Sequence, residues 1–218
     1  MEIEPNIKWY YQQTCMKVIA ELEKRNIRPY YCESKDEVTN KVLSLLTPGA
    51  SIGIAGSMTL KEINLVDTLE KNGYNVFNQY RFGLSKEESL RLRREGTYAD
   101  FYFSSVNAIT LAGELVVFNA YGNRVAGIAY AKKTILIAGA NKIVSTLQEA
   151  ISRVRNYVTP INCKRLGMRT PCADDGLCKS DICYPPDYER NCCQILIIES
   201  EWTKDRLHLI LVAESLGY

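Results

Sequence analysis

Apolar and polar positions along the chain predict two helices first, and then an alternation of strands and helices. Between Ile7 and Arg25, apolar residues recur at the three- and four-residue spacing of an amphipathic helix. A second helix is expected to begin near Ser34, where S-K-D-E matches a capping box, and to end before Pro48. Together they make up a predicted N-terminal helical segment, residues 1–48.

After this segment the pattern changes to short apolar runs separated by longer amphipathic stretches. The runs ASIGIAG, YNVFN, ADFYFSSVNAIT, ELVVF and KTILIAGA predict strands. The stretches SMTLKEINLVDTLEKNG, LSKEESLRLRREG, NRVAGIAYA and STLQEAISRVRNY predict helices, the second with a capping box at Ser85 and Glu88. Such alternation is typical of βαβ units, so we expect an α/β fold with a mostly parallel sheet sandwiched by helices. Two late runs, QILIIES and LHLILVAE, are expected to pair antiparallel at an edge or to form a small extra layer.

The composition favours one globular domain without a nucleic-acid or membrane partner. The 218 residues, 46% of them hydrophobic, can build one sizeable core, so a single domain is predicted over residues 1–218. The 27 basic and 25 acidic residues are interspersed and leave a net charge of +2, which offers no electrostatic footprint for nucleic acid or an anionic membrane. No secretory signal is visible, and no apolar run approaches the ~20 residues of a membrane span, so we expect a cytoplasmic protein.

The segment IAGSMTLKEI predicts an anion site where a strand turns into a helix. Gly56 and Ser57 allow a tight turn, and Thr59 with Glu62 matches a capping box. Free N–H groups at a helix start attract phosphate or carboxylate, and the two hydroxyl groups add donors. The alternative is an ordinary strand-to-helix turn. The spacing of a Walker loop or a dinucleotide fingerprint is missing, so no nucleotide cofactor is expected.

Further polar side chains gather over residues 104–127, among predicted strand ends and glycine turns. Arg124 is suited to bidentate binding of an oxyanion, and Glu114 is the one carboxylate placed to act as a base or nucleophile. Asn141 and Lys142 follow the last central strand and are expected at the same carboxyl edge of the sheet. The alternative is that these residues only serve the turns. The predicted ligand-binding residues are Gly56, Ser57, Thr59, Asn107, Thr110, Asn123, Arg124, Asn141 and Lys142, with Glu114 as the catalytic candidate.

Six of the eight cysteines lie in a predicted Cys-rich insertion loop, residues 163–193. Their spacing, C-x8-C-x5-C-x4-C-x8-C-C, lacks the C-x2-C pair of a standard zinc ribbon. In the cytosol, clustered thiols more often bind metal or react than form stable disulfides, and four thiolates suit zinc or an iron–sulfur cluster equally well. Reduced or redox-active thiols are the second alternative, and structural disulfides the third. The predicted ligands are Cys172, Cys178, Cys183 and Cys192, with Cys193 as a substitute for its neighbour.

The remaining candidate residues are expected to be structural. The single histidine, His208, lies in an apolar run and is expected in the core or on an edge strand, so neither a catalytic triad nor a histidine-ligated zinc site is predicted. Cys15 and Cys32 are expected to be buried or incidental thiols.

Several segments, taken in order, resemble the LUD-domain family of proteins linked to bacterial lactate utilisation. They are GSMTLKEI, NAIT followed by GELV and GNRVA, then NKIV, PINCKRLG and TPC with the later cysteines. The resemblance implies a fold similar to the sugar-isomerase and CoA-transferase superfamily, in which the equivalent loops hold phosphorylated sugars or acyl-CoA. It also implies a role in an operon-encoded system that oxidises lactate to pyruvate, in which some partners carry iron–sulfur clusters. The chain departs from the family pattern at Asn119, where an acidic residue is usual, and at Cys178-x4-Cys183, where C-x2-C is frequent.

The leading hypothesis is therefore a LUD-domain protein of lactate or related 2-hydroxy-acid metabolism that binds a small anionic substrate. One alternative is a non-catalytic, metal-bearing subunit that docks onto an iron–sulfur oxidoreductase. Another is an enzyme of the CoA-transferase or sugar-isomerase type with Glu114 as nucleophile. Zinc or an iron–sulfur cluster is the expected cofactor, while catalysis by this chain itself and a homo-oligomeric state are left open.

Overall fold

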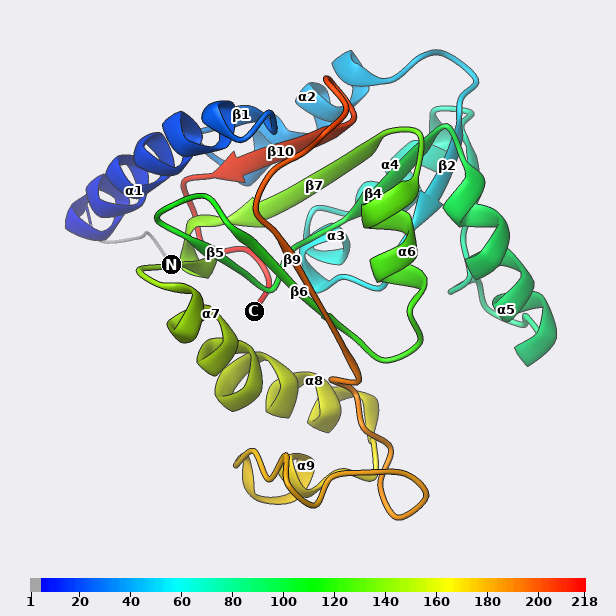
Figure 1. Ribbon diagram of the computed structural model, residues 1–218. Coiled ribbons are helices and arrows are strands. Elements are labelled where there is room, and N and C mark those ends of the chain that lie inside the picture. The colour runs from blue at the N-terminus through cyan, green and yellow to red at the C-terminus, as the bar shows by residue number, and fades with distance from the viewer. Residues whose placement is uncertain (1–4) are drawn as a thin grey trace.

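Six parallel strands form the main sheet of the protein, which the computed structural model describes over residues 5–218 (Figure 1). Every neighbouring pair in this sheet is parallel. The first four residues, with which the predicted domain and its N-terminal helical segment begin, lie outside the described range. The spatial order is β1 (Arg28–Cys32), β10 (Leu207–Val212), β7 (Thr134–Gly139), β4 (Phe101–Ser104), β2 (Ser51–Ile54) and β3 (Asn75–Phe77).

A smaller, mixed sheet packs against one face of the main sheet. Strands β5 (Ala108–Thr110) and β6 (Leu115–Asn119) form an antiparallel hairpin. Strand β9 (Gln194–Ile198) pairs antiparallel with β6, and the short strand β8 (Ile143–Val144) pairs parallel with β5 at the opposite edge. Apolar side chains of this sheet and of the main sheet share one buried cluster. The order is β8, β5, β6 and β9.

Helices cover the outer faces of the two packed sheets. Along β7, alternate side chains serve opposite faces: Ile135 and Ile137 point to one buried cluster and Leu136 to the other. The predicted α/β class, a mostly parallel sheet sandwiched by helices, is confirmed. One face carries α2 (Val38–Leu45), α3 (Met58–Glu62) and α4 (Leu65–Lys71), and the other carries α1 (Pro5–Lys24), α6 (Asn123–Tyr130) and the small sheet.

The outer face of the small sheet is covered by a long helical segment that leads to the cysteines. Here α7 (Leu147–Arg153) continues through a π turn (Val154–Val158) into α8 (Thr159–Leu166). After it come α9 (Pro171–Asp175) and an irregular segment, residues 176–193, which form a separate lobe at the bottom of Figure 1. No helix within residues 5–218 is both long enough and apolar enough to cross a membrane.

Two strand predictions need correction. The run LHLILVAE supplies β10, which lies between β1 and β7 inside the main sheet, and only QILIIES supplies the small layer, as β9. All six residues of β10 are buried, as is typical of a parallel strand covered on both faces. The run ADFYFSSVNAIT breaks at residues 105–107, so β4 and β5 belong to different sheets. Strand β1 lies between the two helices predicted for the N-terminal segment, and no strand was predicted there.

Only one of the three predicted capping boxes forms. Ser85 and Glu88 make both hydrogen bonds of the box at the start of α5 (Lys86–Glu95). Thr59 lies inside α3 instead, and Ser57 caps that helix by accepting a backbone N–H bond at 3.3 Å. Ser34 makes no side-chain cap. The carboxylate of Glu37, which was expected to complete its box, accepts a bond from the N–H group of Glu33 instead.

Candidate functional site

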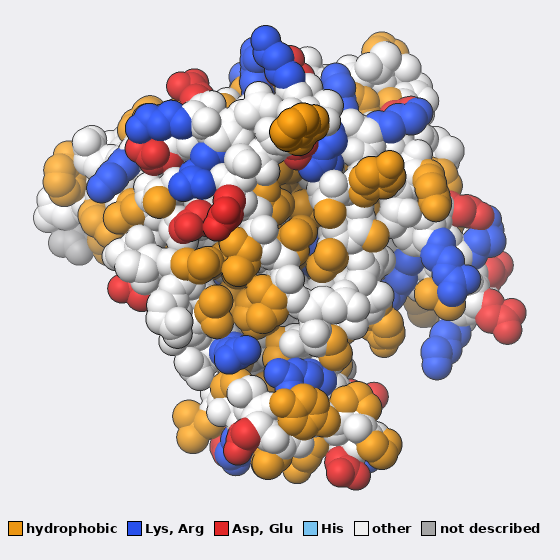
Figure 2. All heavy atoms as spheres, in the orientation of Figure 1, with side chains coloured by type: hydrophobic (Ala, Val, Ile, Leu, Met, Phe, Trp, Pro, Cys, Tyr) orange, Lys and Arg blue, Asp and Glu red, His pale blue; other side chains and the backbone are white. Residues whose placement is uncertain are grey.

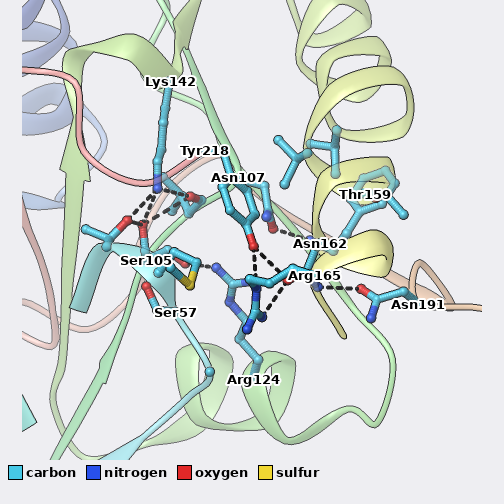
Figure 3. Close-up of a pocket in the computed structure, with 17 residues that line it drawn as sticks. Ser57, Ser105, Asn107, Arg124, Lys142, Thr159, Asn162, Arg165, Asn191 and Tyr218 are labelled. Atoms are coloured by element: carbon cyan, nitrogen blue, oxygen red, sulfur yellow. Dashed lines mark hydrogen bonds between the residues drawn. The ribbon is translucent and has the colours of Figure 1, made fainter. Parts of the chain in front are cut away.

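A polar cavity lies at the carboxyl ends of β2, β4 and β7, the edge where parallel α/β sheets place their ligands (Figure 3). The turn after β2 contributes residues 56–59, and the break between β4 and β5 contributes residues 105–107. The α7–α8 segment closes the opposite side. The cavity volume is about 70 Å³, enough for a small number of water molecules. It therefore suits a ligand of a few heavy atoms.

Lys142 sits at the base of this cavity, in the 3₁₀ turn that follows β7, and is only 2% exposed. Its Nζ donates to Thr59 Oγ1 at 2.7 Å, to Ser105 Oγ at 2.9 Å and to the Val106 carbonyl at 3.3 Å. Burial lowers the pKa of Lys142 well below its ordinary value, and the nearby charge of Arg124 lowers it further. The amine is thus fixed by three acceptors, none of which carries a negative charge.

Arg124 enters the cavity from the first turn of α6 (Figure 3). Its Nε donates to Ser104 Oγ at 3.1 Å, and its Nη2 donates to the Ser105 carbonyl. Its backbone N–H is held by Asn119 Oδ1 at 3.3 Å. Burial lowers the pKa of Arg124 to about 10, which leaves the guanidinium charged at neutral pH. Asn119 therefore positions the start of α6.

Three residues that the sequence analysis did not select complete the opposite wall. Tyr218 Oη donates to Asn162 Oδ1 at 3.0 Å and accepts a bond from Arg165 Nε at 2.7 Å (Figure 3). Arg165 and Asn162 belong to α8, within the segment PINCKRLG that carries part of the family resemblance. No sequence signal marked Tyr218, because only the return of the chain after β10 brings it to the cavity.

Within the described part of the chain, the only charged side chains that line the cavity are basic. Arg124, Lys142 and Arg165 line it, and none of its lining side chains is acidic. Arg153, which donates to the carbonyls of Asn107 and Asn141 just behind the cavity, adds a further positive charge that lowers the pKa of Lys142. A site with this balance attracts anions and repels cations.

Six of the nine predicted ligand-binding residues meet at this cavity, and three do not. Thr110 lies at the far end of β5 and Asn123 begins α6, where its carbonyl accepts a bond from Tyr102. Asn141 fastens the C-terminal segment by accepting from Leu216 N and donating to the Gly217 carbonyl. The six that line the cavity are Gly56, Ser57, Thr59, Asn107, Arg124 and Lys142.

Glu114, the predicted catalytic carboxylate, lies in the hairpin turn between β5 and β6 and does not line the cavity. Its carboxylate accepts a bond from Thr110 Oγ1 at 2.7 Å, and its own N–H donates to the same hydroxyl at 3.1 Å. Asn107 and Phe118, which do line the cavity, stand at the opposite end of this hairpin. The geometry therefore gives Glu114 a role in the turn rather than at the cavity.

A second, smaller cavity lies in the lobe, and the four predicted metal ligands surround it. Cys172, Cys178, Cys183 and Cys192 all line it, together with Cys163 of α8. All eight cysteines of the chain are free thiols, so the alternative of structural disulfides is not found. Within residues 5–218, no three His, Cys, Asp or Glu side chains are arranged as ligands for a single ion.

The residues expected to be structural are buried as predicted. Cys15 is completely buried in α1, and Cys32 is 1% exposed in β1. His208 is 8% exposed in β10, stacks on Tyr30 at a ring distance of 5.9 Å and lines neither cavity.

Comparison with known proteins adds a family and a fold. The LUD domain model matches residues 15–212. A solved DUF162 family protein from Deinococcus radiodurans is similar over 94% of this chain and 98% of its own, with a TM-score of 0.52 and 13% sequence identity. Ribose 5-phosphate isomerases also match: that of Plasmodium falciparum over 51% of this chain and 52% of its own (TM-score 0.33, 18% identity), and that of Methanocaldococcus jannaschii over 62% and 67% (0.36, 18%). No curated protein matches significantly.

Proposed function

Because the chain belongs to the LUD domain family, we propose that it acts in lactate or related 2-hydroxy-acid metabolism and binds a small carboxylate in the polar cavity. One observation carries the proposal: Arg124 and Lys142 face a cavity that no acidic side chain lines. Burying the Arg124 guanidinium and the Lys142 amine without an acidic side chain in the cavity lining disfavours their charged forms. An anionic ligand would supply the missing charge.

The dimensions and donors of the cavity support a small 2-hydroxy acid over a larger anion. Its volume of about 70 Å³ suits a small molecule such as lactate better than a sugar phosphate or acyl-CoA. In the proposed complex the carboxylate pairs with Arg124 and replaces one of the three acceptors that Lys142 Nζ contacts. The hydroxyl groups of Ser57 and Tyr218, which line the same cavity, suit the 2-hydroxyl group of the ligand.

We propose that the chain is one component of an oxidoreductase system and does not carry out the whole reaction alone. Oxidation of a 2-hydroxy acid to a 2-oxo acid removes two electrons and two protons, and the sequence contains no nucleotide fingerprint for a hydride acceptor. We propose that the electrons pass to a redox partner protein. The CoA-transferase alternative loses its nucleophile, because Glu114 lies in the hairpin turn, away from the cavity.

Isothermal titration calorimetry with lactate, glycolate, pyruvate, inorganic phosphate, ribose 5-phosphate and acetyl-CoA tests the ligand class. We expect the small 2-hydroxy acids to bind, and Arg124→Ala to abolish that binding. Arg94→Ala is the matched control, since Arg94 is an exposed residue of α5 outside the cavity. Absence of binding by every small carboxylate, or equal binding by the Arg124→Ala variant, would disprove the proposal.

A further inference from the structure

Five thiols from three separate parts of the chain surround the cavity in the lobe. Cys163 is fully buried in α8, Cys172 lies in the first turn of the short helix α9, and the other three come from the irregular segment 176–193. Cys172 and Cys183 are each 8% exposed, although the segment around them is mostly exposed. The polypeptide thus turns its cysteines inward, while most of its charged side chains point to solvent.

The lobe has almost no apolar core that would hold this arrangement. Its buried cluster consists of Cys163, Cys172 and Ala173, with Met168 packed against them. Larger apolar side chains of the lobe stay on the outside: Leu177 is 64% exposed. Figure 2 shows hydrophobic side chains spread over the surface of the lobe at the bottom of the view. Small structural units that bury so little apolar surface usually depend on disulfides or a metal, and the thiols here are free.

A single arginine fixes the backbone around the thiols. Arg190 Nη1 donates to the carbonyls of Ser180 at 3.0 Å and Cys183 at 3.1 Å, and its Nε donates to the Cys192 carbonyl at 3.3 Å. Its guanidinium lies 4.8 Å from the centre of the Tyr184 ring. The arginine therefore holds two cysteine-bearing stretches together and brings a positive charge next to them. Such a charge stabilises thiolates bound to a metal.

We propose that the thiol-lined cavity of the lobe binds a metal centre through cysteine thiolates, with Cys172, Cys178, Cys183 and Cys192 as ligands and Cys163 beside them. Soft sulfur ligands select zinc or iron–sulfur clusters over hard cations. A zinc ion needs its sulfur atoms at about 2.3 Å, converging on one point, whereas an iron–sulfur cluster takes one thiolate at each of several iron atoms. The five thiols line one cavity, and metal analysis distinguishes the two kinds of centre.

The location of the thiol cavity links it to the carboxylate site. Thr159 and Asn191 line both cavities, and Asn191 directly precedes Cys192. Asn191 also accepts a bond from Asn162, which holds Tyr218 at the polar cavity. A metal centre in the lobe would therefore fix one wall of the neighbouring site. This functional consequence, unlike the metal site itself, rests on the proposed function.

Anaerobic purification of the full chain, followed by metal analysis, sulfide determination and visible spectroscopy, tests the metal site. Protein obtained without metal is reconstituted anaerobically, either with ferrous iron and sulfide or with zinc. Iron and sulfide with thiolate-to-iron absorption identify a cluster, and stoichiometric zinc with no colour identifies a single ion. Both outcomes support a thiolate-bound metal centre. Protein that retains no metal after either reconstitution refutes it.

Two single substitutions locate the site without disturbing the core. Cys178→Ser changes a half-buried thiol that lines the cavity, and we expect metal content to fall at least fivefold. Cys193→Ser changes an exposed thiol that does not line it, and we expect full retention. Circular dichroism confirms that both variants fold. Equal metal retention by the two variants overturns the ligand assignment. A metal-loaded protein that binds no carboxylate upholds the metal site and refutes only the proposed function.

Discussion

Replacing Lys142 with methionine tests the proposed carboxylate site, and the same variant shows separately what Lys142 contributes to the stability of the fold. The substitution keeps most of the side-chain volume but removes the amine that donates to Thr59, Ser105 and Val106. A hydrogen bond to a charged partner contributes about 1.5–3 kcal/mol, so the variant is expected to bind a 2-hydroxy acid about 10- to 150-fold more weakly. Isothermal titration calorimetry measures this loss.

The same variant is expected to fold about as stably as the native chain, or more so. Each of the three lost hydrogen bonds contributes about 0.5–1.5 kcal/mol, while burial of an ammonium group costs several kcal/mol. Because the pKa of Lys142 is lowered on folding, its contribution opposes folding increasingly as pH falls below the ordinary lysine pKa of about 10.4. Urea denaturation of Lys142→Met is expected to show a free energy of unfolding that depends less on pH.

The affinity for a 2-hydroxy acid is expected to increase as pH falls. The charged groups facing Lys142 are Arg124, Arg153 and, more weakly, Glu62, and the two arginines lower its pKa. A bound carboxylate raises that pKa, so binding takes up a proton and strengthens as pH falls between the bound and free values. Calorimetry in two buffers of different ionisation enthalpy detects the proton.

Lys61→Met is the matched control for the loss of charge. Lys61 is an exposed residue of α3 and lies outside the cavity. We expect this variant to bind within twofold of the native chain and to keep its pH dependence. The reasoning is refuted if Lys142→Met binds lactate within threefold of the native chain, or if binding releases a proton.

The remaining predictions concern the hairpin, the helix packing and a cap. Glu114→Gln is expected to leave lactate affinity unchanged within twofold in calorimetry, because its partner is Thr110; a loss above tenfold would return Glu114 to the site. Gly127→Ala is expected to cost about 1–3 kcal/mol in urea denaturation, because the added Cβ would lie 2.2 Å from a ring carbon of buried Tyr102; full stability would contradict this. Ser85→Ala is expected to lower the free energy of unfolding by about 0.5–2 kcal/mol, and an unchanged urea midpoint would show that the cap does not matter.

The fold was largely predictable because the hydrophobic pattern of a parallel sheet is strong. Short runs such as TILIAG are buried on both faces, and all six of its residues are buried in β7. The pattern does not encode strand order, however. The run LHLILV looked like an added strand because it comes last in the chain, whereas it pairs with β1 and β7 inside the sheet. Partner choice depends on long-range packing that periodicity leaves undetermined.

The site was predictable only where its residues follow predicted strands. Ser57 and Lys142 each come directly after a buried run, so the carboxyl-end rule placed them correctly. Glu114 and Thr110 satisfied the same local criterion of polar residues near a turn, but they lie at the opposite end of a hairpin. Tyr218 shows the converse difficulty, since it reaches the cavity through contacts with α8 that no local pattern reveals.

The α7–α8 segment explains how one helical element serves two cavities. The π turn at Val154–Val158 interrupts the α-helical hydrogen bonding just before Thr159, and such turns widen the helix locally and rotate the residues after them. Beyond it, Asn162 lines the polar cavity, while the next residue, Cys163, lines the cavity of the thiols. Adjacent helical residues point about 100° apart, as 3.6 residues per turn requires. The helical register after the π turn therefore places an amide at the polar cavity and a thiol at the other, so that one helix contributes a residue to each cavity.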